Sequence, residues 1–258
     1  MCVSSLCTDG LYVVYIIYAM SEEHTVARLE KKQKKGVRVI TAREYYLLRN
    51  TVVEMLYDRS EQDVGRYGFE RGCLDIYRMI PYEVVDSIYD DYVKDGAIST
   101  LNFQYSVPST FNEVKTKAIF LFADRSDEVR TIINSLRGKI PTTTHVFIML
   151  TTGTRPSQMT VPSSAEGQFE VFWYKQLLFN ITKHILVPKH ELLAESVKNN
   201  LIKQYYLETI TQLPTILSTD PVAKWYGMQE GDVCRITREN PNVGTTHIYR
   251  YVTVPAYN

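Results

Sequence analysis

Glu113 and Lys115 are the first pair of residues whose types and spacing could do chemistry, and they directly precede an apolar run at residues 118–123. Metal-dependent nucleases use this spacing, in which a carboxylate holds the ion and a lysine polarises the attacking water. The second acid of such a site would come from one of three upstream carboxylates: Asp90, Asp91 or Asp95. Glu30 and Lys32 repeat the same spacing inside a charged run, so the motif has little specificity. The pattern favours a charged lead-in to a strand, and a nuclease centre stays an alternative.

Other signatures of catalysis are missing from the sequence. It contains no glycine-rich phosphate loop, no H-E-x-x-H motif and no G-x-S-x-G motif. The five histidines are dispersed, and the nearest two, His184 and His190, flank Pro188 at a spacing that does not suit metal ligands. The four cysteines form no C-x-x-C pair, which is typical of a reducing compartment and argues against a zinc site. We therefore expect no catalytic residue, no metal site and no cofactor.

The composition is that of a globular protein. Of 258 residues, 45% are apolar and 22% are charged, and Lys plus Arg equals Asp plus Glu at 29 each. This balance gives no whole-protein attraction to nucleic acid, although a local basic patch can still provide one. The apolar run at residues 11–20 is about half the length of a membrane-spanning helix, so we expect no membrane contact. The count of 19 tyrosines favours a large contact surface, because the ring is apolar and the hydroxyl polar.

Residues 1–40 are expected to form a flexible extension. Their lysine run EKKQKKG, residues 30–36, favours a solvated tail or the exposed end of a helix over a nucleic-acid-binding arm. Thr41 is a suitable N-cap for a helix whose apolar residues follow helical spacing: Tyr45, Leu48, Val52, Met55 and Leu56. Three polar residues fall outside that stripe: Arg43, Arg49 and Asp58. A second helix is predicted from Pro81 to Tyr92, with four residues facing inward: Val84, Val85, Ile88 and Tyr92.

The middle of the chain predicts a strand-helix-strand unit. The apolar runs at residues 118–123 and 145–150 read as strands covered on both faces. Between them, Ser126 and the two acids after it suit a helix start, and Gly138 and Pro141 suit its end. The buried stripe of this helix is predicted to be Val129, Ile132, Ile133 and Leu136. A connection of this kind favours parallel strands, and a further strand is predicted at residues 169–174.

The last third of the chain predicts a compact α+β module. Helical spacing around residues 194–206 involves four residues: Val197, Leu201, Ile202 and Tyr205. The stretch QLPTI is predicted to be extended because Pro214 disfavours helix at the residue before it. In DPVAKWYG, we expect Asp220 as N-cap, Pro221 as first helical residue and Gly227 as the stop. Residues 231–238 and 245–254 form a predicted antiparallel pair.

Several long motifs in this module occur together. They are HILVPKH at residues 184–190, QLPTI at 212–216, DPVAKWYGMQEGDV at 220–233, and the pair Tyr249-Arg250. In this order and spacing, they closely resemble the C-terminal assembly module that the fifth common subunit of eukaryotic nuclear DNA-directed RNA polymerases shares with its archaeal counterpart. The resemblance implies a structural subunit, not an enzyme by itself, that docks on the largest polymerase subunit and joins the other subunits.

The resemblance points to a set of partner-interface residues. These are Lys189, His190, Gln212, Leu213, Pro214, Asp220, Pro221, Tyr226, Gly227, Gly231, Tyr249 and Arg250. Lys189, His190 and Arg250 are expected to be the exposed polar members of the set. Prolines and capped turns would keep such a surface rigid and lower the ordering entropy lost on binding.

Residues 42 to about 174 resemble the eukaryotic jaw domain of the same family more loosely. The resemblance implies an α/β jaw beside downstream double-stranded DNA, with Arg155, Pro156 and Ser157 near the DNA and no base readout. An ordinary exposed loop is the alternative for these three residues. The predicted regions are the extension 1–40, the jaw 41–174 and the assembly domain 175–258. The expected location is the nucleus, or the nucleolus if the subunit serves only the ribosomal-RNA polymerase.

Departures from the family pattern leave the polymerase class open. The turn Met228-Gln229-Glu230 is acidic where the family tends to be basic, and residues 1–40 have no counterpart in it. The chain is therefore either the shared subunit or a diverged copy dedicated to one polymerase. Two functional alternatives also stay open, namely the metal-dependent nuclease and a free transcription adaptor that reuses the assembly module.

Overall fold

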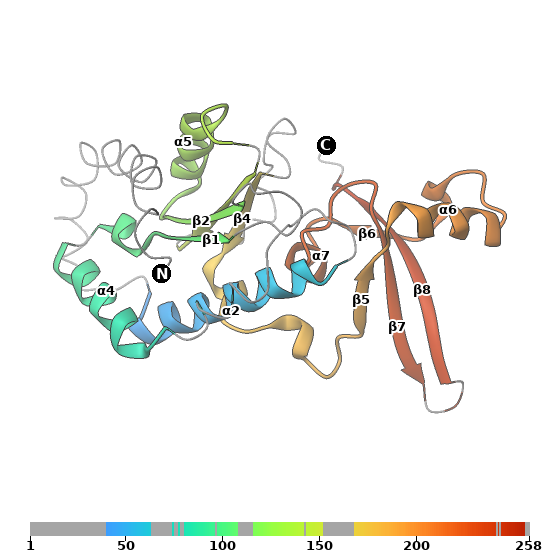
Figure 1. Cartoon of the computed structure of the whole chain (residues 1–258), viewed down its shortest axis with the longest axis horizontal. Helices are drawn as coiled ribbons and strands as arrows, with labels where there is room; N and C mark the ends of the chain where they lie inside the picture. The colour runs from blue at the N-terminus through green and yellow to red at the C-terminus, as the bar shows by residue number, and fades with distance from the viewer. Residues whose placement is uncertain are drawn as a thin grey trace, which may run out of the picture.

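A computed structural model of the chain contains two four-stranded mixed sheets joined by a long helix (Figure 1). The structure describes residues 40–62, 74, 77, 80–95, 97–107, 116–141, 143–151, 168–240, 242 and 244–255. The strand orders are β1-β2-β3-β4 and β5-β7-β8-β6. The predicted combination of α/β and α+β elements is thus present in its coarse form, and the boundary near Lys175 stays a prediction.

The first sheet contains the predicted strand-helix-strand unit. Its strands are β1 (Phe103–Val107), β2 (Thr116–Ala123), β3 (Thr144–Leu150) and β4 (Phe169–Trp173). β3 pairs in parallel with both β2 and β4, which confirms the predicted direction. The sequence did not predict β1, an antiparallel edge strand that puts Phe103 opposite Phe120.

Each face of this sheet is covered by a different helix (Figure 1). Ile119 and Leu121 of β2 pack with α5 (Ser126–Leu136), whose predicted stripe lies in the same cluster. Phe120 and Phe122, on the opposite face, belong to the larger core that contains α2 (Ala42–Ser60). Successive side chains of a strand point to opposite faces. The continuous apolar run predicted as a doubly covered strand is therefore confirmed.

α2 begins where the sequence predicts. The Thr41 hydroxyl accepts the amide of Glu44 at 3.2 Å, and the Glu44 carboxylate accepts the amide of Thr41 at 2.9 Å, which closes a capping box. All five residues of the predicted apolar stripe are buried. Arg49, which the sequence placed outside that stripe, is nevertheless only 9% exposed. Its guanidinium lies 4.7 Å from the centre of the Phe103 ring, so it is held by an aromatic face of β1.

α4 (Tyr82–Asp95) packs against α2. Among the described residues, four short 3-10 segments lie in the connections: Ile98–Leu101, Tyr174–Leu177, Ile181–Lys183 and Ile210–Gln212. Val85 and Tyr92 are buried as predicted, and Ile88 is half-buried. The inward prediction for Val84 is wrong, because its side chain is 50% exposed. Tyr89 takes the inward position instead, since residues 85, 89 and 92 share one helical face.

The second sheet is built on the predicted antiparallel pair. β7 (Val233–Asn240) and β8 (Gly244–Thr253) form its centre, and β5 (Lys189–Leu192) and β6 (Thr215–Leu217) form its edges. β6 runs parallel to β8, so the extended conformation predicted around Pro214 leads into a sheet edge. α6 (Glu195–Gln204) buries only Leu201 of its apolar residues.

α7 (Pro221–Trp225) has both ends specified as predicted. The Asp220 carboxylate accepts the amides of Val222 at 2.9 Å and Ala223 at 3.4 Å, and Pro221 occupies the first turn. Gly227 follows with a φ of +62°, the left-handed conformation that ends many helices.

Arg59 joins the two sheets. Its guanidinium donates to both carboxylate oxygens of Glu170 in β4, at 2.6 and 2.7 Å. It also donates to the carbonyls of Lys224 and Trp225 at the end of α7, each at 2.7 Å. The last carbonyls of a helix have no partner within the helix. Arg59 therefore completes the C-terminal end of α7 while it pairs with the first sheet.

Neighbouring residues of α2 extend this joint. The Trp225 indole donates to the Asp58 carboxylate at 2.8 Å, and the Gln62 amide oxygen accepts the amide of Leu192 in β5 at 2.8 Å. Burial raises the pKa of Asp58, and the Trp225 hydrogen bond opposes that rise. The last turn of α2 thus contacts α7, and Gln62, two residues after the helix, contacts an edge of the second sheet.

Replacement of Arg59 by Met should destabilise the protein by about 3 to 5 kcal/mol, because it removes the ion pair with Glu170 and the hydrogen bonds to the carbonyls of Lys224 and Trp225. Urea titration of the full chain measures the loss. Arg43→Met is the matched control in the same helix, because Arg43 is exposed, and we expect a change within about 0.5 kcal/mol. The double variant Arg59→Met/Glu170→Gln should recover part of the loss. Equal stability of the single and double variants would contradict the uncompensated carboxylate as the cause.

Gly227→Val should destabilise the chain by about 1 to 3 kcal/mol, because a β-branched residue is strained at a φ of +62°. Gly227→Asn is the control, since asparagine tolerates the left-handed region better than valine does. Thermal unfolding of the two variants gives the comparison. Equal melting temperatures for the wild type and the valine variant would refute the role assigned to this turn.

Candidate partner interface

The predicted interface residues differ widely in exposure. Lys189, Gln212, Pro214 and Pro221 are exposed; Leu213, Asp220, Gly231, Tyr249 and Arg250 are half-buried; His190, Tyr226 and Gly227 are buried. The motifs that contain them all lie in or beside the second sheet and α7. They therefore divide into residues that can touch a partner and residues that hold the surface in shape.

His190 belongs to the second group. The prediction that it is an exposed polar residue is wrong, because it is only 7% exposed. Its Nδ1 lies 2.7 Å from the carbonyl oxygen of Pro188, and a carbonyl can only accept, so Nδ1 carries the proton. Burial lowers the pKa of His190, and this hydrogen bond opposes the shift. The neutral ring fixes the chain at the point where it enters β5.

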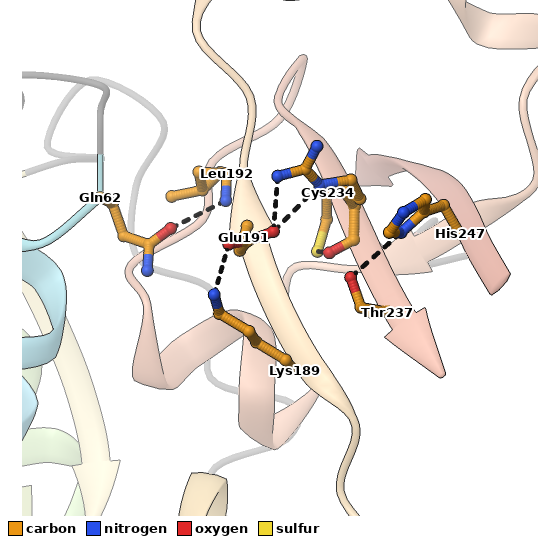
Figure 2. A network of polar contacts seen from close by, with 8 residues as sticks. Gln62, Lys189, Glu191, Leu192, Cys234, Thr237 and His247 are labelled. Atoms are coloured by element: carbon orange, nitrogen blue, oxygen red, sulfur yellow. Dashed lines mark hydrogen bonds and ion pairs between the residues drawn. The ribbon is translucent and has the colours of Figure 1, made fainter. Parts of the chain in front are cut away.

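Lys189 lies at the exposed end of a polar network on β5 and β7 (Figure 2). Its ammonium group is 2.7 Å from the Glu191 carboxylate, which also accepts Nε and Nη2 of Arg235 at 2.9 and 2.7 Å. The hydrogen bond from Lys189 lowers the pKa of Glu191, burial opposes it, and Arg235 adds to the lowering. Lys189 is thus exposed as predicted, but it is already paired within the chain.

Arg250 and Tyr249 connect β8 to neighbouring segments of the C-terminal region. The Arg250 guanidinium donates to the carbonyl of Thr215 at 2.8 Å and so attaches the short strand β6. The Tyr249 ring packs edge-on against Tyr205, with ring centres 5.9 Å apart. Both residues are half-buried, so each contributes to the fold and still presents part of its surface.

The remaining members are mostly structural. Tyr226 is 8% exposed, and burial raises the pKa of its hydroxyl to about 12, so the hydroxyl stays protonated. The Gln212 side chain accepts the amide of Glu208 at 3.1 Å, and the Pro214 carbonyl accepts the amide of Tyr251 at 2.9 Å. Gly231 has a φ of +91°, which suits a turn directly before β7.

The sequence reasoning missed the most exposed aliphatic residues of this region. Ile185 is 93% exposed and Leu186 is 81% exposed, and both lie between the 3-10 turn Ile181–Lys183 and β5. Hydrogen bonds hold this apolar tip, defined as Ile185 and Leu186: the His184 Nδ1 accepts the amide of Leu186 at 3.2 Å, and the His184 carbonyl accepts the amide of Val187 at 2.8 Å. Three consecutive aliphatic residues between His184 and Pro188, outside any helix or strand pattern, were the available signal.

The predicted DNA-proximal residues Arg155, Pro156 and Ser157 lie outside the described residues. The structure describes the start of their loop, at Thr151, whose hydroxyl donates to the Asp124 carboxylate at 2.8 Å. Thr151 and Asp124 directly follow β3 and β2. The loop therefore leaves the sheet at the carboxyl ends of two parallel strands.

The nuclease alternative gains no support from the geometry. Glu113 and Lys115 lie outside the described residues, and the proposed second acids Asp90, Asp91 and Asp95 are exposed on α4. In the described ranges, no group of three or more His, Cys, Asp or Glu residues could hold a metal ion. None of the described helices is long and apolar enough to cross a membrane.

Comparison with known proteins tests the predicted resemblance. Residues 179–252 match the family described as RNA polymerase Rpb5, C-terminal domain. The proteins named DNA-directed RNA polymerase subunit Rpo5 from Pyrococcus abyssi, Pyrococcus horikoshii and Thermococcus kodakarensis are each 43% identical over 74 residues. The aligned part is 29% of this chain and 89% of each relative. The family match at residues 179–252 contains the apolar tip, α7 and all of the second sheet except Thr253. The predicted resemblance is confirmed, and the chain belongs to the Rpb5 family of DNA-directed RNA polymerase subunits.

Proposed function

We propose that this chain is a non-catalytic subunit that attaches to the largest subunit of its polymerase through the C-terminal region, residues 175–258. Support comes from the position of the family match at residues 179–252, which includes the exposed apolar tip. The archaeal relatives consist almost entirely of this region, since 89% of their length aligns to it. A region that makes up nearly a whole subunit is a reasonable carrier of the contact with other subunits. Neither the nuclease nor the free adaptor is favoured by these relatives.

The exposure of the apolar tip is the main observation that supports docking through the C-terminal region. Leaving Ile185 and Leu186 in water forfeits the roughly 1.5 to 3 kcal/mol that burial of each aliphatic side chain provides. The hydrogen bonds to His184 and the buried ring of His190 beside Pro188 fix the backbone on both sides of the tip. A fixed apolar anchor loses little entropy on binding, and anchors of this kind dominate the binding energy of interfaces.

The predicted interface residues act in two ways in this proposal. Lys189, Gln212, Pro214 and Pro221 are exposed and therefore available for direct contact. Lys189 follows the anchor in β5, whereas Gln212 and Pro214 precede β6 at the opposite edge of the sheet. The buried members, His190, Tyr226 and Gly227, keep the strands and α7 in position. Substitution of a buried member therefore acts through the fold, whereas substitution of the tip acts on the contact itself.

We also propose that the N-terminal region, residues 41–174, lies beside downstream DNA as a jaw. Arg155, Pro156 and Ser157 would make non-specific contacts with the DNA backbone. The described start of their loop, at Thr151, lies at the carboxyl end of β3. A polymerase subunit of this eukaryotic type is expected in the nucleus, and in the nucleolus if it serves only the ribosomal-RNA polymerase.

Ile185→Asp/Leu186→Asp should abolish stable assembly. Affinity purification of the tagged chain at moderate salt, followed by mass spectrometry, should recover the two largest polymerase subunits with the wild type and at least about tenfold less with the variant, since tenfold corresponds to only 1.4 kcal/mol. Because both side chains are exposed, the melting temperature of the purified variant should not change.

Val84→Asp is the matched control, because Val84 is an exposed aliphatic residue outside the family match. It should assemble like the wild type. Full assembly of the tip variant would show that the anchor lies elsewhere. If the wild type itself does not recover the large subunits, a free transcription adaptor becomes the favoured function.

Arg155→Ala should weaken the binding of downstream DNA by the assembled polymerase without changing sequence preference. Loss of one phosphate contact lowers the slope of log affinity against log salt by about one. DNA affinity measured over a salt series tests this, with Arg130→Ala on α5 as an exposed arginine control. An unchanged slope would favour the ordinary exposed loop.

A further inference from the structure

The outer face of α4 has no partner within the part of the chain that the structure describes. Val85, Tyr89 and Tyr92 turn inward, and the opposite face carries Glu83 and Asp90 into solvent. The helix holds five carboxylates against one lysine: Glu83, Asp86, Asp90, Asp91 and Asp95 against Lys94. Among the described residues, their one ion pair joins Lys94 and Asp91 at 3.4 Å, with both side chains largely exposed. The helix therefore carries an excess of negative charge, and Lys94 is the one described cation that forms an ion pair with it.

Apolar side chains border the same face. Val84 is 50% exposed, Tyr82 is 41% exposed and Val93 is 37% exposed. These are high values for aliphatic and aromatic residues on one helix of 14 residues. A face that combines carboxylates with exposed apolar side chains suits a basic segment that also contains aliphatic residues.

Ile40 places such a segment beside α4. Ile40 is fully buried, and its carbonyl accepts a hydrogen bond from the Tyr89 hydroxyl at 2.8 Å. Tyr46 packs edge-on against Tyr82 at 5.2 Å between ring centres, and Figure 1 shows the start of α2 beside α4. The chain before Ile40 is therefore attached at the middle of this helix.

The charges of the adjoining segment complement those of α4. Residues 31–38 read KKQKKGVR and contain five cations and no acid: Lys31, Lys32, Lys34, Lys35 and Arg38. Residues 35–39 can span about 17 Å when extended, since each residue covers up to about 3.4 Å. Half the circumference of a helix about 10 to 12 Å wide is about 16 to 19 Å. The tether is therefore long enough to carry the lysines from the inner side of α4 to its outer face.

We propose that residues 31–35 of this chain dock on the outer face of α4 and pair their lysines with its carboxylates. The attachment at Ile40 gives the segment a high effective concentration at the helix, so weak individual pairs suffice. The pairs lie in solvent, where each one contributes little and salt screens it. Docking is therefore salt-sensitive. The proposal does not depend on the role of the chain in the polymerase.

Carbodiimide cross-linking of the purified full chain tests the contact, because the reagent joins a carboxylate to an amine only when they touch. At about 50 mM salt, mass spectrometry should find links from Lys31–Lys35 to Glu83, Asp90 and Asp91, and their yield should fall at least about fivefold at about 500 mM salt. Replacing Lys31, Lys32, Lys34 and Lys35 by Glu should remove these links. Replacing Glu83, Asp90 and Asp91 by Lys should also remove them, and the two sets combined should restore them with the charges exchanged.

Three exposed acids of the C-terminal region provide the control. Glu208→Lys/Glu230→Lys/Glu239→Lys changes the net charge by the same amount and should leave the cross-links intact. Links from the lysines to these or other acids at comparable yield would overturn the proposal. Links that join isotope-labelled to unlabelled copies would overturn it in favour of contact between two chains. Failure of the combined variant to restore the links, with an unchanged melting temperature, would also overturn it.

Discussion

The side chain of Arg59 is the constraint on which the arrangement of the two sheets depends. It is 1% exposed, and it lies between a carboxylate of the first sheet and two carbonyls at the end of α7. A buried guanidinium is tolerated only when its donors are satisfied, and these acceptors come from both halves of the chain. Burial raises the pKa of Glu170, but Arg59 outweighs it, so the net pKa is lowered and the pair stays ionised near neutral pH. Neither half of the chain provides the full set of acceptors alone.

This joint makes α2 a shared element of both sheets. Its apolar stripe packs against the first sheet, while Asp58 and Arg59 on its last turn bind α7. Gln62, two residues after the helix, accepts a hydrogen bond from β5. The largest core cluster accordingly contains residues of both regions, such as Leu56 and Trp225. The matched family region therefore does not stand apart from the rest of this chain, because its α7 rests on a helix outside the match.

Polar side chains that form hydrogen bonds with the backbone fix the surface of the C-terminal region. His190 donates a hydrogen bond to the carbonyl of Pro188, and His184 accepts one from the amide of Leu186. Asp220 caps α7. These bonds fix the backbone from which the apolar tip and the end of the Lys189 side chain extend into solvent. The sequence motif HILVPKH thus combines the anchor with the histidines that position it. Recurrent residues in such a motif need not touch the partner, because a residue that fixes the backbone is as necessary as one that makes contact.

Local sequence was sufficient to specify four features: the capped start of α2, the parallel strand-helix-strand unit, the β7–β8 pair and both ends of α7. Each depends on hydrogen bonds or periodicity within a short stretch, and the family motifs lie on these elements. Long-range packing alone settled the burial of Arg49, Arg59 and His190, the pairing of β1 and β5, and the exposure of Val84 and the apolar tip. These outcomes depend on partners far away in sequence, 111 residues for Arg59 and Glu170 and 166 residues for Arg59 and Trp225. A local pattern carries no information about such partners, because they meet only when the chain folds.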